Sequence, residues 1–124
     1  MAYPSLRGKG KLLKVYIGES DRWRGEALFH AIVKRIKQEG MAGATVIRGI
    51  EGFGANSRIR SASVLRLSED LPILIEVVDE DRKIDRLIEI LDEMIREGLV
   101  MVVQDVEIIK YAHSDPGGSN SSSH

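Results

Sequence analysis

The sequence predicts an α+β sandwich, in which a four-stranded antiparallel sheet carries two helices on one face. Three observations lead to this fold class. Apolar residues alternate along one short segment, concentrate in three other short segments and follow helical spacing along two longer ones. These segments come in the order strand, helix, strand, strand, helix, strand. The second half of the chain also repeats the first half at a fixed offset.

The first strand and the first helix are predicted from residues 13–17 and 25–39. In the strand, apolar residues alternate with lysine and tyrosine. The helix has five apolar residues at helical spacing, namely Leu28, Phe29, Ile32, Val33 and Ile36. We expect Ser20 or Asp21 to be its N-cap and Gly40 to be the left-handed residue that follows its end.

The remaining elements are two strands, a second helix and a last strand. Residues 45–47 begin the second strand, which runs into glycine-rich sequence. The third strand is predicted at 71–79, with Pro72 at its start, where a missing amide does least harm. The amphipathic second helix is expected to end at Gly98, and its apolar residues are Ile84, Leu87, Ile88, Leu91, Met94 and Ile95. The last strand is predicted over 100–109.

The ends of the two helices reveal an internal repeat. Residues 32–41 align with residues 90–99, and each segment ends on a glutamate, a glycine and an apolar residue. The same offset of 58 residues places Val15 on Ile73, so the first strand overlays the third. Two βαβ halves with right-handed crossovers interleave into a ferredoxin-like βαββαβ sandwich. Because so small a domain has no third layer for the other sheet face, we expect self-association through the sheets.

Composition excludes several classes of protein. The 124 residues fit one domain, for which we expect a flexible lead-in at 1–10, a folded part at 11–113 and a disordered Ser/Gly-rich tail at 114–124. The 18 basic residues balance 19 acidic ones, which argues against a general nucleic-acid binder. The absence of cysteine excludes disulfides, thiolate metal sites and cysteine nucleophiles. Without a secretory signal or a long apolar run, the expected protein is soluble and cytoplasmic.

The most unusual stretch is 48–60, with the sequence RGIEGFGANSRIR. Glycines let the backbone approach a bound anion, and arginines make bidentate contacts to phosphate. The candidate ligand-binding residues here are Arg48, Gly49, Glu51, Gly52, Phe53, Gly54, Arg58 and Arg60. By residue chemistry alone, a hairpin connection whose glycines serve turn geometry is favoured over a ligand loop. The connection of about residues 52–70 is, however, unusually long, and such loops are often functional.

A second candidate is the junction at 18–25, with the sequence GESDRWRG. It precedes a predicted helix N-terminus, where anions bind. The candidate ligand-binding residues are Gly18, Glu19, Asp21, Arg22 and Arg24, of which the acidic two could instead reach a ribose hydroxyl or a metal ion. The alternative is a capping segment in which Trp23 packs against the helix.

Neither a metal site nor a catalytic site is expected. Residues 79–81 are acidic, but such a run is more often the first turn of a helix, where the dipole favours it. His30 and His113 lack a partner at ligand spacing. No Ser-His-Asp order or paired-carboxylate site stands out, so no catalytic residue is assigned.

Three separated motifs carry a resemblance to a known family. They are KLLKVYIGESDRWRG, AGATVIRGIEGFGANSRI and RLSEDLPILIEVVDE, within residues 11–111. With them the sequence resembles the domain-of-unknown-function 190 family, also called UPF0166, whose members have a PII-like fold. The resemblance implies a homotrimer that binds adenine nucleotides in clefts between subunits and signals through the long loop between strands two and three. Gly52, Phe53 and Gly54 resemble the Gly-Phe-Gly segment that opens this loop in PII proteins.

The chain also departs from PII proteins. Residues 97–100 lead directly from the second helix into the last strand, leaving no room for the second, lysine-containing phosphate loop. Basic C-terminal residues that grip a triphosphate are not evident either. The resemblance therefore implies a regulatory protein for AMP or ADP, or for another ligand, rather than a triphosphate sensor.

Partners and rival functions follow from the same resemblance. Some family members are encoded near or fused to ion-channel proteins, which leaves a membrane transport protein open as a partner; no nucleic acid is expected. The alternatives are a small oligomeric enzyme acting on a nucleotide-type ligand in the same cleft, or a purely structural oligomer. An RNA-binding module is disfavoured, since the chain has only two phenylalanines and the central strands lack an exposed aromatic pair.

Overall fold

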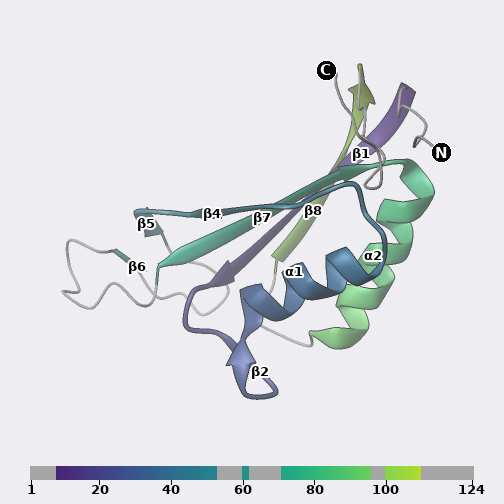
Figure 1. Cartoon of the computed structure of the whole chain (residues 1–124). Coiled ribbons are helices and arrows are strands. Elements are labelled where there is room, and N and C mark those ends of the chain that lie inside the picture. Colours follow the sequence, from purple (N-terminus) through teal and green to yellow (C-terminus); the bar gives the residue numbers. More distant parts are fainter. Residues whose placement is uncertain (1–7, 53–59, 62–70, 96–99, 110–124) are drawn as a thin grey trace, which may run out of the picture.

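A computed structural model describes residues 8–52, 60–61, 71–95 and 100–109. Its centre is a four-stranded antiparallel sheet with the strand order β4-β7-β1-β8 (Figure 1). The strands are β1 (Gly8–Gly18), β4 (Thr45–Arg48), β7 (Pro72–Asp79) and β8 (Val100–Ile108). The ferredoxin-like fold class is confirmed, and β4, β7 and β8 begin where the sequence predicts them to within one residue.

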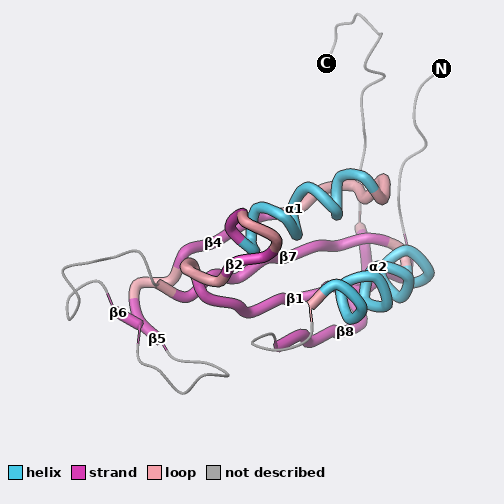
Figure 2. Tube along the Cα trace, turned by 90° about the horizontal axis from the view of Figure 1, so that it is seen from below, coloured by secondary structure: helices cyan, strands magenta, loops and turns pink. Residues whose placement is uncertain are grey.

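Two helices cover one face of this sheet, and two short hairpins lie at its margin. The helices α1 (Leu28–Gln38) and α2 (Asp81–Met94) lie on the same side of the sheet in both views (Figures 1 and 2). Between β1 and α1 the chain forms the hairpin of β2 (Arg22–Trp23) and β3 (Glu26–Ala27). The second hairpin pairs β5 (Glu51–Gly52) with β6 (Arg60–Ser61). It lies beyond the end of β4, away from the helices (Figure 1).

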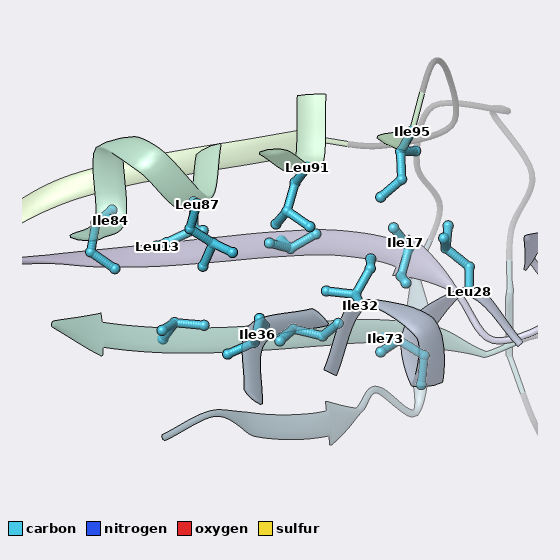
Figure 3. Packing of buried hydrophobic residues seen from close by; sticks show 13 residues of the cluster. Leu13, Ile17, Leu28, Ile32, Ile36, Ile73, Ile84, Leu87, Leu91 and Ile95 are labelled. Carbon is cyan, nitrogen blue, oxygen red and sulfur yellow. The ribbon is translucent and has the colours of Figure 1, made fainter. Parts of the chain in front are cut away.

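The core lies between the sheet and the helices (Figure 3). Alternate residues of β1 and β7 point into it, and they are Leu13, Val15, Ile17, Ile73, Ile75 and Val77. The helices contribute Leu28, Ile32, Ile36, Ile84, Leu87 and Leu91. This period of two in the strands and of three to four in the helices is what the sequence pattern predicts.

In the described part of the chain no element covers the opposite face of the sheet, on which several large apolar side chains lie. Four large side chains on it are between 41% and 48% exposed, namely Tyr16, Ile47, Val78 and Val102. The register places Tyr16 and Ile47 beside Leu74 and Val78 beside Leu12, and both leucines are half-buried. Val102 pairs with Lys14, which lies opposite Glu76. Exposed apolar surface of this kind marks contact surfaces in soluble proteins.

The first strand begins earlier than the alternation of apolar residues indicated. β1 starts at Gly8, inside the expected lead-in, because β8 extends far enough to pair with it through Ile108. Gly10 lies where a side chain would not fit: a Cβ there would stand 2.8 Å from the Asp79 carbonyl oxygen. Residues 1–7 and the expected tail at 114–124 lie outside the described part of the chain.

The start of α1 corrects the sequence-based prediction. The helix begins at Leu28 after Ala27, not at residue 25 after a Ser20 or Asp21 cap. The Asp21 side chain accepts a hydrogen bond from the Gly18 amide at 2.8 Å instead. The intervening hairpin turns at Arg24 and Gly25, which both have positive φ (49° and 86°), as a type I′ hairpin turn requires.

The ends of the helices agree with the sequence in one case and differ in the other. After α1, Gly40 has φ +75° as expected, and the Met41 and Gly40 amides donate to the carbonyls of Ile36 and Lys37 in a Schellman motif. α2 ends at Met94 rather than at Gly98, because Ile95 is already extended. No helix in the described part is long and apolar enough to span a membrane.

Candidate functional site

The two stretches that the sequence singled out meet at one end of the sheet. Here β1 and β4 end and β7 begins, on the side of the β5/β6 hairpin (Figure 1). Gly18 pairs with Pro72 in the β1–β7 register. From the other side, the Gly49 amide donates a hydrogen bond of 2.7 Å to the Pro72 carbonyl. Pro72 is therefore the residue on which both stretches converge.

An ion pair joins the two stretches directly. Arg48 Nη2 donates to Glu19 Oε2 at 2.5 Å. The other carboxylate oxygen, Oε1, accepts the Leu71 amide at 3.4 Å, while the Glu19 amide donates to the Leu71 carbonyl at 2.8 Å. Glu19 thus holds both the end of β4 and the residue that precedes β7.

The two partners of this ion pair differ in exposure. The Glu19 side chain is 18% exposed and the Arg48 side chain is 53% exposed. The hydrogen bond from Arg48 to Glu19, followed by the charge of that carboxylate, raises the pKa of Arg48. The guanidinium is a permanent cation whose outer part faces solvent, and it can reach an anion placed beside the edge strand.

The glycines after β4 have different surroundings. A Cβ on Gly49 would stand 2.8 Å from Pro72 Cγ, closer than van der Waals contact permits, and the Gly49 amide is already donated. Gly49 therefore packs against Pro72 and offers no free N–H to a ligand. A Cβ on Gly52 would meet Pro72 Cγ at 3.4 Å, an ordinary contact, and Gly52 pairs with Arg60 in the β5/β6 hairpin.

The arginines of the 18–25 stretch are held within their own hairpin. Arg22 Nη2 donates to the Gly25 carbonyl at 2.7 Å. The Arg24 guanidinium stacks over the Trp23 ring at 4.6 Å from its centroid. The Trp23 indole N–H donates to the carbonyl of Met94 at 3.0 Å and so ties the hairpin to the end of α2. Both arginines are solvent-exposed, and neither makes a described contact with the Glu19–Arg48 pair.

The structure brings together part of the predicted site. Gly18, Glu19, Asp21, Arg48 and Gly49 cluster at the sheet end, and Glu51 and Gly52 follow in β5. Of the others, Phe53, Gly54 and Arg58 lie outside the described residues, and only the backbone of Arg60 is described.

Sequence reasoning missed the role of Pro72, which touches the positions of both glycines. A proline at the first position of a strand, facing a glycine-rich strand end, was the available signal.

The acidic run after β7 has a structural role. Asp79 is 2% exposed, and its carboxylate accepts the amides of Ala42 at 2.8 Å and Glu80 at 2.7 Å. Asp81 lies in the first turn of α2, as the dipole favours. Among the described residues, no group of three or more His, Cys, Asp or Glu side chains is placed to hold a metal ion.

Hollows at two other places in the described part are weaker candidates. One of about 200 Å³ lies beside α1 and is lined by Trp23, Glu26, Ala31, Lys34, Arg35, Gln38 and Met94. Its cations are already paired, Lys34 with Glu26 and Arg35 with Glu39. The other, of about 350 Å³, lies next to the start of β4 against Glu76 and Val78, on the uncovered face of the sheet. Among the described residues that line them, neither hollow presents an unpaired cation to an anionic ligand.

Comparison with known sequences gives a consistent set of relatives. Residues 10–108 match the family DUF190, described as Uncharacterized ACR, COG1993. A UPF0166 protein of Methanocaldococcus jannaschii is 37% identical over 102 residues, which cover 82% of this chain and 94% of that protein. A UPF0166 protein of Aquifex aeolicus is 35% identical over 101 residues, with the same shares covered.

Solved structures of PII-like proteins share the fold. CPII, a nitrogen regulatory PII-like protein from Thiomonas intermedia K12 bound to ADP, AMP and bicarbonate, superposes with a TM-score of 0.62. The two sequences are 14% identical, and the match covers 85% of this chain and 91% of CPII. A putative PII-like signaling protein from Thermus thermophilus has a TM-score of 0.61 at 20% identity, covering 82% of this chain and 91% of that one.

Proposed function

The chain belongs to the DUF190 (UPF0166) family, and from this we propose that it is a PII-like regulatory protein that binds AMP or ADP between the subunits of a homotrimer. The family resemblance carried by the three motifs is confirmed. Two adenine nucleotides are ligands of CPII, which has the same fold. Adenine nucleotides are thus the first ligands to test.

The observation that carries the proposal is the position of Arg48. It is the last residue of the edge strand β4, its guanidinium is half exposed, and Glu19 keeps it at the sheet end. A guanidinium can bind a phosphate group bidentately, and Gly52, in the β5 strand that follows, has no side chain to keep a ligand from the backbone. The opposite wall of the pocket would come from a neighbouring subunit, since β4 is an edge strand.

The homotrimer is supported by the uncovered face of the sheet. Tyr16, Ile47, Val78 and Val102 expose apolar surface there, although the same sheet has a well-packed helix face. Burying such surface between copies of the chain is a common source of stable assembly. The trimer also provides the second wall that the nucleotide needs.

Adjacent positions on β8 offer a matched test of this assembly. Val102 and Val103 are 48% and 45% exposed, but their register places them on opposite faces of the sheet. We expect Val102→Lys to yield a monomer in sedimentation equilibrium, whereas Val103→Lys stays trimeric. A parent protein with a concentration-independent monomer mass would refute the trimer.

The proposed role is regulatory rather than catalytic. The connection between β4 and β7 is the proposed signalling segment. Glu19 contacts the residues that flank this connection, Arg48 before it and Leu71 at its end. Isothermal titration calorimetry with AMP and ADP, followed by chromatography of the recovered nucleotide, tests both parts. Saturable binding with unchanged nucleotide supports the proposal, absence of binding contradicts it, and turnover of the nucleotide favours an enzyme.

A further inference from the structure

We propose that Glu19 sets the ligand charge that the site accepts: its carboxylate disfavours phosphorylated ligands, and more strongly the more negative they are. This inference rests on the proposed nucleotide site at Arg48. It concerns a residue that does not bind the phosphate but competes with it.

The carboxylate of Glu19 is anchored independently of Arg48. The Leu71 carbonyl accepts the Glu19 amide at 2.8 Å and fixes the main chain of Glu19, and the Leu71 amide donates a long hydrogen bond of 3.4 Å to the carboxylate oxygen Oε1. The Glu19 side chain is 18% exposed, in contrast to the half-exposed side chain of Arg48. When an anion arrives, Arg48 is therefore the partner free to move, and the negative charge of Glu19 remains in place.

Binding of an anion to Arg48 then meets two opposing effects. If the guanidinium leaves Glu19, the ion pair of 2.5 Å is lost, at a cost that is equal for every ligand. Whether or not it leaves, the fixed carboxylate repels the bound anion, with an energy proportional to the charge of the ligand. The first effect lowers all affinities, and the second lowers them in the order of ligand charge.

The test ligands form a series of increasing negative charge: cyclic AMP, AMP, ADP and ATP. Calorimetry without divalent cations leaves these charges unneutralised. Glu19→Gln removes the negative charge but keeps an oxygen that can accept the Leu71 amide. We expect this variant to bind AMP about threefold and ADP about fivefold more tightly than the parent, since the repulsion energy is proportional to the charge of the ligand.

Glu39→Gln is the matched control. Glu39 is 20% exposed, accepts a hydrogen bond from Arg35 at 3.0 Å and pairs with Arg86 at 3.5 Å, so the variant removes glutamate–arginine ion pairs far from the sheet end. We expect it to leave all four affinities unchanged. The gain in Glu19→Gln should also vanish near 1 M salt, where the Debye length falls to about 3 Å.

The outcomes separate this inference from the proposed function. If the parent binds no nucleotide, or if Arg48→Gln binds as tightly as the parent, the proposed site itself is refuted. Two results with Glu19→Gln would overturn the charge inference alone, provided that Arg48→Gln weakens binding. One is that Glu19→Gln binds the nucleotides no more tightly than the parent does. The other is that its affinity rises by the same factor for all four ligands. Should Glu19→Gln fail to fold, Glu19→Ala is measured instead, with the same order of gains expected.

Discussion

The glycine at the end of β4 provides a sharp test of how the site is built. A Cβ on Gly49 would stand 2.8 Å from Pro72 Cγ, whereas ordinary contacts begin at 3.4 Å. The φ angle of Gly49 is not in the left-handed region, so alanine suits the backbone and only the packing opposes it. Gly49→Ala thus isolates the close approach of the two strand ends.

The expected loss of stability follows from the atoms that have to move to make room for the new Cβ at position 49. A change in the pucker of the Pro72 ring gives a few tenths of an ångström, and the remainder has to come from separating Gly49 from Pro72. That separation stretches the 2.7 Å hydrogen bond from the Gly49 amide to the Pro72 carbonyl. Overpacking costs about 1–3 kcal/mol and a weakened hydrogen bond up to about 1 kcal/mol. We expect a net loss of about 2 kcal/mol.

Gly52→Ala is the control for this prediction. Its Cβ would meet Pro72 at 3.4 Å, so the side chain fits, and the less flexible unfolded chain offsets any small contact cost. We expect its stability to stay within about 0.5 kcal/mol of the parent. Urea unfolding by circular dichroism, at one fixed protomer concentration, measures both variants. Equal midpoints for Gly49→Ala and Gly52→Ala would refute the reasoning.

Two further predictions concern binding and pH. Gly52→Val should abolish the calorimetric signal of AMP or ADP while the thermal unfolding midpoint stays near that of the parent; undiminished binding would show that the pocket lies elsewhere. Lys11 donates to Asp85 at 2.7 Å, and this hydrogen bond raises the pKa of Lys11 above its ordinary 10.5. A lysine whose pKa is higher in the folded state than in the unfolded state stabilises the fold at any pH below its unfolded pKa, and this contribution is lost as the pH rises through its folded pKa. Asp85→Asn should therefore be less stable than the parent up to about pH 10. The two urea midpoints should converge as the pH rises past 10.5, and a constant gap would contradict this assignment.

The central part of the fold was predictable because its sequence signals are redundant. Alternation predicted that Val15 shares a face with its apolar neighbours in β1, and the repeat offset of 58 residues overlaid β1 on β7 and so predicted the same for Ile73; both residues are buried. That offset maps Tyr16 onto Leu74, and these two residues are paired in the observed register. The structure thus has an approximate twofold axis at this pair, with the antiparallel central strands on either side of it.

The departures from prediction occur where one residue decides a conformation. The β2/β3 hairpin has two residues in each strand, too few for any periodicity, and its turn requires positive φ at Arg24, which the sequence does not indicate. At the other end of the fold, Ile95 is 7% exposed and fits the apolar pattern of α2, yet its backbone is extended. The spacing of apolar residues therefore predicted which side chains are buried better than it predicted the residue at which α2 ends.

The candidate site lies where the two halves of the repeat differ. Residues 19–27 form a turn and the β2/β3 hairpin between β1 and α1, whereas their counterparts in the repeat, residues 77–85, continue β7 and begin α2 with a single residue between the two elements. The connection at 49–71 lies between the two halves and has no counterpart in the repeat. Both connections leave the sheet at the same end, because β1 and β4 run parallel to each other across the antiparallel β7. The repeated elements supply the core, while Glu19 begins the first connection and Arg48 directly precedes the second, and the two residues meet in an ion pair. A ligand site at this pair can therefore change without disturbing the packing that the two halves share.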